Sequence, residues 1–248
     1  MRHVLAVSFL VAGTLMMGCA APGAPEQAAP DQPTRNPHPD ARSLRYVALG
    51  DSYTIGTGVE EHERWPNQLV AAVDDPQLEL VANLGVNGAT SDDLIEHQLP
   101  RVAALEPGLV TVQIGVNDVV RRVRGGRYGD DGGALPARHY RDNVELILDR
   151  LLDLLPANRI VVVSTPDYTL TPMGDAFGDP AQQSAAIEEF NAILQDAARQ
   201  RGIAFVDIGP VADRVPAEPS LVATDRLHPS GAQYREWVEL IAPVVRAD

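Results

Sequence analysis

Residues 46–54 read Tyr46-Val47-Ala48-Leu49-Gly50-Asp51-Ser52-Tyr53-Thr54, a short apolar run that ends at a glycine and then presents a serine. An apolar run bounded by glycine is typical of a central strand in a parallel sheet. Ligands of open α/β sheets bind at the carboxyl ends of such strands. We therefore expect Ser52 to lie at that edge, where its hydroxyl needs a base and oxyanion donors to act as a nucleophile.

Three later stretches supply candidate partners for this serine. They are Asn83-Leu84-Gly85-Val86-Asn87-Gly88, Gly115-Val116-Asn117-Asp118 and Asp225-Arg226-Leu227-His228-Pro229. Gly85 follows an apolar run, and its missing side chain lets its N–H approach an oxyanion, although a tight turn is the simpler role. Asn117 also follows an apolar run, where its amide can donate or can serve as a turn residue. Asp225 and His228 are spaced so that the carboxylate can hold one imidazole nitrogen while the other faces the serine.

In this order the blocks resemble those of the SGNH (GDSL-type) esterase and lipase family, which read GDS, G, GxND and DxxH. The resemblance covers the chain from Arg45 to its end and implies a flavodoxin-like, three-layer α/β/α fold with about five parallel strands and helices on both faces. It also implies that Ser52 is the nucleophile, His228 the base and acid, and Asp225 the residue that orients the histidine. The implied oxyanion donors are the N–H groups of Ser52 and Gly85 and the Asn117 amide, with no cofactor and no metal.

The remaining chain alternates expected strands and helices, a pattern that predicts one parallel sheet covered on both faces. Further strands are expected at 78–84, 109–114, 159–164 and 203–207, and helices at 65–73, from Thr90 or Ser91 onward, and at 138–155, 180–201 and 229–245. The Gly-rich segment 121–137 is expected to be a loop that flanks the site. Arg226 replaces the small residue common at its position in the family block, which bears on the shape of the pocket.

Composition excludes several other kinds of function. The formal charge of −14 argues against nucleic acid as a partner, because phosphate binding needs a basic face. The 20 basic residues are all arginine, which removes lysine-based chemistry. A single cysteine, Cys19, allows neither an internal disulfide nor a cysteine metal site. Asp51 and Asp118 lack the spacing of known metal motifs, so we expect them to accept hydrogen bonds from local backbone N–H groups.

The first residues predict export from the cell. Residues 1–18 have a positive start and a short apolar core, which is typical of a secretory leader. The junction Gly18-Cys19 resembles the bacterial lipoprotein cleavage box, which implies a lipid on Cys19 and a membrane anchor in the cell envelope. The alternative is an ordinary leader followed by a bystander cysteine. Residues 19–43 are rich in proline and alanine and predict an extended tether, so 44–248 is the expected hydrolase domain.

These observations predict an exported serine hydrolase that cleaves a small-molecule ester by acyl transfer. Removal of acetyl groups from cell-envelope carbohydrate would use the same residues. A binding protein on an inactive hydrolase scaffold is the alternative from another class, and the complete set of Ser, Gly, Asn, Asp and His argues against it.

Overall fold

The computed structural model describes residues 43–123 and 136–246. The leader 1–18, Cys19 and all of the tether except Ser43 lie outside these ranges, as does most of the Gly-rich segment. The predictions of export, of a lipid on Cys19 and of an extended tether therefore stay predictions.

Five parallel strands form one sheet in the order β2-β1-β3-β4-β5. They are β1 (Leu44–Gly50), β2 (Leu78–Asn83), β3 (Leu109–Gln113), β4 (Ile160–Val163) and β5 (Ala204–Val206). This order is the flavodoxin-like one, and it changes direction between β1 and β3, where open α/β sheets bind their ligands. The predicted fold class is confirmed, and Ser52 follows one of the two strands at that switch point.

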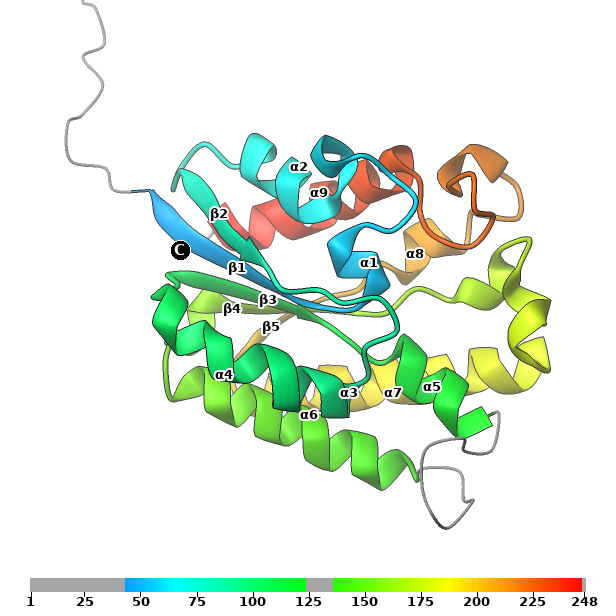
Figure 1. The fold of residues 1–248 in the computed structure, drawn as a ribbon, viewed down its shortest axis with the longest axis horizontal. Coiled ribbons are helices and arrows are strands. Elements are labelled where there is room, and N and C mark those ends of the chain that lie inside the picture. Colours follow the sequence, from blue (N-terminus) through cyan, green and yellow to red (C-terminus); the bar gives the residue numbers. More distant parts are fainter. Residues whose placement is uncertain (1–42, 124–135, 247–248) are drawn as a thin grey trace, which may run out of the picture. The chain divides into compact units, whose positions relative to one another are not determined.

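Helices cover both faces of the sheet (Figure 1). The helices α2 (Trp65–Ala72) and α9 (Gly231–Arg246) pack together on one face, and α6 (Ala137–Leu152) and α7 (Pro180–Gln200) pack together on the other. The other α-helices of the described residues are short: α1 (Ser52–Ile55), α3 (Ser91–Asp93), α4 (Leu99–Val102), α5 (Val116–Val123) and α8 (Gly209–Ala212).

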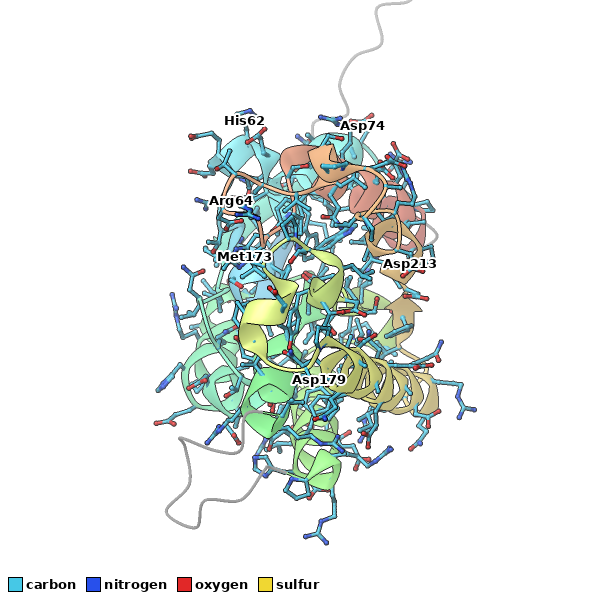
Figure 2. The ribbon with its side chains drawn as sticks, turned by 90° about the vertical axis from the view of Figure 1, so that its right-hand side faces the viewer. His62, Arg64, Asp74, Met173, Asp179 and Asp213 are labelled. Atoms are coloured by element: carbon cyan, nitrogen blue, oxygen red, sulfur yellow. The ribbon has the colours of Figure 1, made fainter. Side chains whose placement is uncertain are left out.

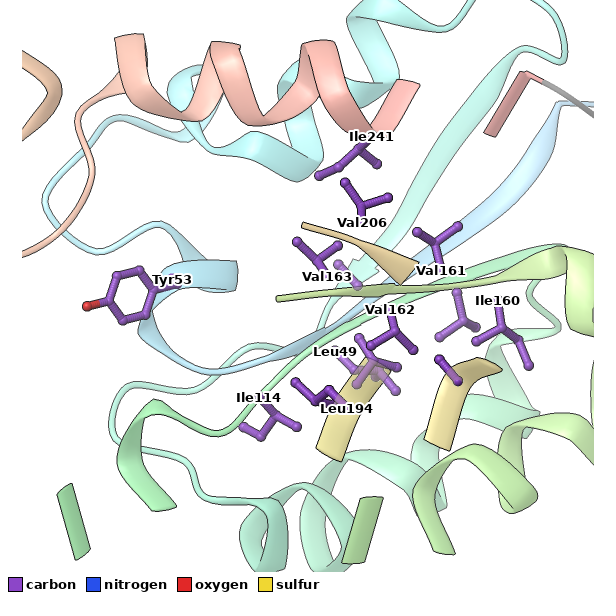
Figure 3. Close-up of a cluster of buried hydrophobic side chains, with 14 of the residues drawn as sticks. Leu49, Tyr53, Ile114, Ile160, Val161, Val162, Val163, Leu194, Val206 and Ile241 are labelled. Atoms are coloured by element: carbon purple, nitrogen blue, oxygen red, sulfur yellow. The ribbon is translucent and has the colours of Figure 1, made fainter. Parts of the chain in front are cut away.

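The core lies between the sheet and both helical layers. Because successive strand residues point to opposite faces, Val163 lies on the side of Ile241 of α9, whereas Val162 lies on the side of Leu194 of α7 (Figure 3). All of these side chains are buried. Tyr53 of α1 belongs to the same buried cluster and lies beyond the strand ends in this view. The polar residues at the sheet edge therefore lie beside a buried apolar core.

The segment after β3 differs from the expected loop. The structure continues as α5 through Val123, so Asn117 lies in the first turn of a helix and Arg121 to Val123 are helical. The reason is a set of valines at helical spacing, of which Val116 and Val119 are buried against the core. The expectation of irregular chain at 121–137 is wrong for these residues and for Ala137, which begins α6.

Figure 2 looks onto the right-hand end of the molecule as it is drawn in Figure 1, and the segment that carries Met173 crosses its centre. This segment joins β4 to α7, and the Met173 N–H donates to the Arg226 carbonyl oxygen at 3.2 Å. The connections after β4 and β5 are thus hydrogen-bonded to each other beside the expected site.

Among the described residues, no helix combines the length and the apolar character needed to cross a bilayer.

Candidate active site

Ser52 is the first residue of α1, directly after β1 and the Gly50 turn. The turn is fixed by Asp51, whose Oδ1 accepts a hydrogen bond from the Tyr53 N–H at 2.9 Å. This is the local backbone contact expected for Asp51. The Ser52 side chain keeps a narrow opening to solvent, with 8% of the residue exposed. Its hydroxyl is therefore held in place and still accessible to a small ligand.

The structure brings Ser52, His228 and Asp225 together as a hydrogen-bonded chain. The Ser52 Oγ lies 2.9 Å from the His228 Nε2, and the His228 Nδ1 lies 2.6 Å from the Asp225 Oδ2. The serine is the first residue of α1, just after β1, and the other two come from the turn before α9, where His228 is 176 positions from Ser52. This is the arrangement in which a histidine can take a proton from the serine while the carboxylate orients the ring.

The turn that carries Asp225 and His228 holds itself in shape. The Asp225 Oδ1 accepts hydrogen bonds from the N–H groups of Leu227 and His228, both at 3.0 Å. Arg226 has a φ of 67°, in the left-handed region, which turns the chain between the aspartate and the histidine. Burial raises the pKa of Asp225, but the hydrogen bonds from Leu227 and His228 outweigh it and leave this pKa below its ordinary value. The carboxylate is therefore ionised beside the imidazole.

Gly85 does not lie where the sequence predicted it. Its N–H donates to the Asn83 Oδ1 at 3.1 Å, and it does not line the pocket beside Ser52. A Cβ on Gly85 would lie 2.7 Å from the Ile55 nitrogen and 2.8 Å from the Asp51 carbonyl oxygen. The glycine is needed because the loop packs closely against α1, so its assignment as an oxyanion donor is corrected.

Gly88, three residues later, lines the pocket in its place. It has a φ of 78°, a conformation that glycine adopts without strain, and a Cβ there would meet nothing within 4 Å. In the described part of the chain, the N–H groups of Ser52 and Gly88 donate to no protein acceptor. The sequence contains a signal that was missed, since Asn87-Gly88 is a typical turn pair whose glycine takes a positive φ.

Asn117 enters the site from the first turn of α5. Its Nδ2 donates to the Ala89 carbonyl oxygen at 3.0 Å and lies 3.4 Å from the Asp51 Oδ2. The second distance is longer than an ordinary N–H···O bond, so one amide hydrogen is only weakly engaged. Asn117 therefore lines the pocket, and its amide nitrogen has two protein acceptors, of which Asp51 is the weaker.

These groups open into one pocket of about 250 Å³. Its polar lining comes from Thr57, Asn87, Gly88 and Asn117, together with Ser52 and His228. Its apolar lining is formed by Tyr53, Val116, Val120, Tyr168, Phe177 and Leu227. A cavity with few polar groups and a larger apolar wall is typical of a site for a small organic ligand.

Two buried carboxyl groups lie beneath the site. Burial raises the pKa of Asp51 to about 7, opposed by the Tyr53 N–H and reinforced by the nearby Asp118. Burial likewise raises the pKa of Asp118 to about 6, opposed by hydrogen bonds from Ser91. Asp118 was expected to accept from its own backbone neighbours, but its partner Ser91 lies 27 positions away. Burial thus favours the protonated form of both groups.

We expect the Asp51→Asn variant to lose part of the pH dependence of stability. The folded pKa lies above the unfolded value near 3.9, so the folded state binds a proton more tightly, and stability from this group falls as pH rises from about 4 to 7. Asparagine cannot lose that proton. The free energy of unfolding, obtained from thermal melts at pH 5 to 8, should fall less steeply with pH for the variant, by up to about 1.4 kcal/mol per pH unit.

The control is Asp74→Asn, which neutralises an exposed aspartate and should reproduce the wild-type slope. Parallel melting-temperature curves for wild type and Asp51→Asn would show that Asp51 does not titrate in this range.

Comparison with known proteins places the chain among its relatives. The sequence profile of the GDSL-like Lipase/Acylhydrolase family matches residues 48–236. A curated relative, an acetylxylan esterase from Geobacillus stearothermophilus, is 28% identical over 156 residues, which are 61% of this chain and 65% of that esterase. The chain thus spans just under two thirds of that relative's length in the comparison.

Solved structures agree in fold. A crystal structure of an acetylxylan esterase from Geobacillus stearothermophilus superposes with a TM-score of 0.62 and 20% identity, over 83% of this chain and 95% of the other. A member of the lipolytic protein G-D-S-L family from Veillonella parvula DSM 2008 superposes with a TM-score of 0.64 and 14% identity, over 83% and 100%. Since the family profile covers most of the chain and the sheet order agrees, this protein belongs to the GDSL-like lipase/acylhydrolase family.

Proposed function

We propose that this protein is a serine ester hydrolase that transfers the acyl group of its substrate to Ser52. The observation that carries the proposal is the hydrogen-bonded chain from the Ser52 Oγ through the His228 ring to Asp225. It lies beside a pocket where, among the described residues, the N–H groups of Ser52 and Gly88 have no protein acceptor. A serine is a weak nucleophile at neutral pH unless an adjacent base accepts its proton. His228 is within hydrogen-bonding distance to do so.

In the acylation step, the Ser52 oxygen attacks the ester carbonyl as His228 Nε2 takes its proton. The carbonyl oxygen becomes an oxyanion, and the Ser52 N–H, the Gly88 N–H and the Asn117 amide are the donors that face it. His228 then gives the proton to the departing alcohol, and the acyl group stays on Ser52. Water repeats the sequence in deacylation: His228 takes a proton from it, the carboxylic acid leaves, and Ser52 regains its proton.

Asp225 acts through the histidine. Its ionised carboxylate accepts from the Nδ1–H, which leaves Nε2 as the basic nitrogen that faces Ser52. The same charge stabilises the imidazolium that forms when His228 takes the proton. Because the turn already holds the carboxylate, the ring does not have to reorganise during the reaction.

A carbohydrate O-acetyl ester is the second candidate substrate class. The relative with 28% identity is an acetylxylan esterase, and the pocket's polar side, with Thr57 and Asn87 hydrogen-bonded to each other, offers groups that could meet a sugar hydroxyl. Its apolar side instead suits an acyl chain longer than acetyl. Rates on acetylated xylo-oligosaccharides and on p-nitrophenyl esters of graded chain length would rank the two classes.

A serine-directed fluorophosphonate probe tests the proposal against a binding protein on an inactive scaffold. Wild-type protein should be labelled on the peptide that contains Ser52, and prior labelling should block ester hydrolysis to the same extent. Protein that hydrolyses no ester and takes up no probe at Ser52 would reject the proposed function.

The Asn117→Ala variant should separate a catalytic asparagine from a structural one. If the amide donates to the oxyanion, its loss should lower kcat about 10²–10³-fold with little change in KM, because the contact strengthens only as charge develops. Loss of the contact to the Ala89 carbonyl alone would cost about 0.5–1.5 kcal/mol of stability and leave turnover by folded protein unchanged.

Measuring kcat and the melting temperature on one preparation decides between these roles. A destabilised Asn117→Ala protein with wild-type kcat would remove Asn117 from the oxyanion hole and leave only the two backbone donors.

A further inference from the structure

Asp118 has no part in the acyl transfer described above, yet its side chain is among the most fully bonded in the site. Asp118 is 3% exposed. Its Oδ2 accepts from the Ser91 N–H at 2.9 Å, and its Oδ1 accepts from the Ser91 hydroxyl at 2.5 Å. Two donors of one residue therefore meet one carboxylate, which fixes both the distance and the orientation between α5 and Ser91.

Ser91 is itself held from a third element. The Asn143 Nδ2 of α6 donates to the Ser91 Oγ at 2.9 Å, so the serine accepts from α6 while it donates to Asp118. Ser91 is completely buried and follows Thr90, whose side chain caps the same turn by accepting from the Asp93 N–H. The Ser91 hydroxyl thus accepts one hydrogen bond, from Asn143, and donates its single proton to the Asp118 carboxylate.

This contact lies next to the two pocket residues Gly88 and Asn117. Asp118 follows Asn117 in α5, and Ser91 comes three residues after Gly88. The Asn117 amide also binds the Ala89 carbonyl oxygen at 3.0 Å. Two consecutive residues of α5, Asn117 and Asp118, thus bind the segment 88–91 at two points. Helix α5 carries the Asn117 amide, and the segment 88–91 carries the Gly88 N–H.

We propose that Ser91 and Asp118 are positioning residues that keep the Gly88 N–H and the Asn117 amide at the separation needed to share one oxyanion. The inference rests on the proposed function. Oxyanion donors act when they lie about 2.7–3.1 Å from the developing charge. A shift of about 1 Å in such a group can lower the rate about 10²-fold. Loss of the Ser91–Asp118 contact should therefore lower kcat even though neither Ser91 nor Asp118 touches the substrate.

The first test variant is Ser91→Ala, which removes the hydroxyl and leaves the backbone N–H to Asp118. We expect kcat to fall about 10–100-fold with KM within twofold of wild type. Affinity for phenylboronic acid, which forms a tetrahedral adduct on an active-site serine, should fall by a similar factor. Asp118→Asn keeps the shape but replaces one acceptor oxygen with a donor group, and it should move kcat in the same direction.

The matched control is Ser164→Ala. Ser164 is also buried, and its hydroxyl donates to the Asp207 Oδ1 at 3.1 Å, but it does not line the pocket. Its loss should lower the melting temperature about as much as Ser91→Ala and leave kcat and boronate affinity unchanged. The comparison separates loss of a buried hydrogen bond from displacement of the oxyanion donors.

The outcomes are distinct. The proposal is overturned if folded Ser91→Ala keeps kcat within twofold of wild type, if its kcat falls without a loss of boronate affinity, or if Ser164→Ala loses kcat to the same extent. Should Ser91→Ala turn over normally while Ser52→Ala is inactive, the positioning role fails and the proposed function stands. A wild-type protein with no ester hydrolysis would instead reject the function on which the inference rests.

Discussion

The Ser52→Ala variant is expected to lose about 10⁶-fold in kcat on any ester that the wild-type protein hydrolyses. The substitution removes the attacking oxygen and leaves the backbone N–H groups and the pocket in place. The hydroxyl's described hydrogen bond is the one to the His228 Nε2, so its loss breaks no structural network. We therefore expect a folded protein whose residual rate comes from the oxyanion donors and from substrate binding alone.

The measurement is initial rate on a p-nitrophenyl ester, together with probe labelling and the melting temperature. Ser220→Ala, which changes an exposed serine, is the control for preparation and handling and should retain the wild-type rate. Turnover by Ser52→Ala within about 100-fold of wild type, in a preparation free of other esterases, would show that another group is the nucleophile.

The residues that form the hydrogen-bonded chain could be predicted because the fold itself brings them together. Each follows a strand or lies in the last loop before α9, and the carboxyl ends of parallel strands meet at one edge. Short spacings such as that of Asp225 and His228 are set by a single turn, whose geometry the local sequence determines. The structure adds the left-handed Arg226, which sequence spacing alone does not reveal.

The glycine proposed to donate to the oxyanion could not be chosen by its position after a strand alone, although the Asn87-Gly88 turn pair offered a signal. Gly85 and Gly88 both follow β2, and both are required, one for close packing on α1 and one for a positive φ. Which N–H faces the pocket depends on the path of the loop, and that path is set by contacts with α5. The error at Gly85 therefore arose from a tertiary constraint.

The same limit applies to Asp118. A carboxylate after a strand has nearby backbone donors in almost any turn, so local acceptance was the natural expectation. In the structure, α5 begins immediately after β3 and directs the side chain toward Ser91. Helix α5 was not predicted, because its valines are too few to give a clear periodic pattern next to a Gly-rich segment.

The second large effect is expected for Asp225→Asn, which should lower kcat about 10⁴-fold while the protein stays folded. Asparagine has nearly the same shape and can still accept from the Leu227 and His228 N–H groups, so the turn should persist. Its amide group, however, donates a proton toward Nδ1. The imidazole then carries its proton on Nε2, the nitrogen that must accept from Ser52.

This variant isolates the charge and tautomer effect from the geometry of the turn. Burial raises the pKa of Asp225, but hydrogen bonds from Leu227 and His228 outweigh it and lower this pKa in the folded state. The ionised carboxylate therefore stabilises the fold at pH values above the unfolded pKa near 3.9, and this stabilisation is lost as the pH falls through the folded pKa. The matched substitution is Asp213→Asn, at an exposed position away from the pocket, which should leave kcat unchanged. Should Asp225→Asn keep kcat within tenfold of wild type, His228 would be oriented by its surroundings, where Tyr53 packs 5.3 Å from its ring, and the carboxylate would serve mainly to fold the turn.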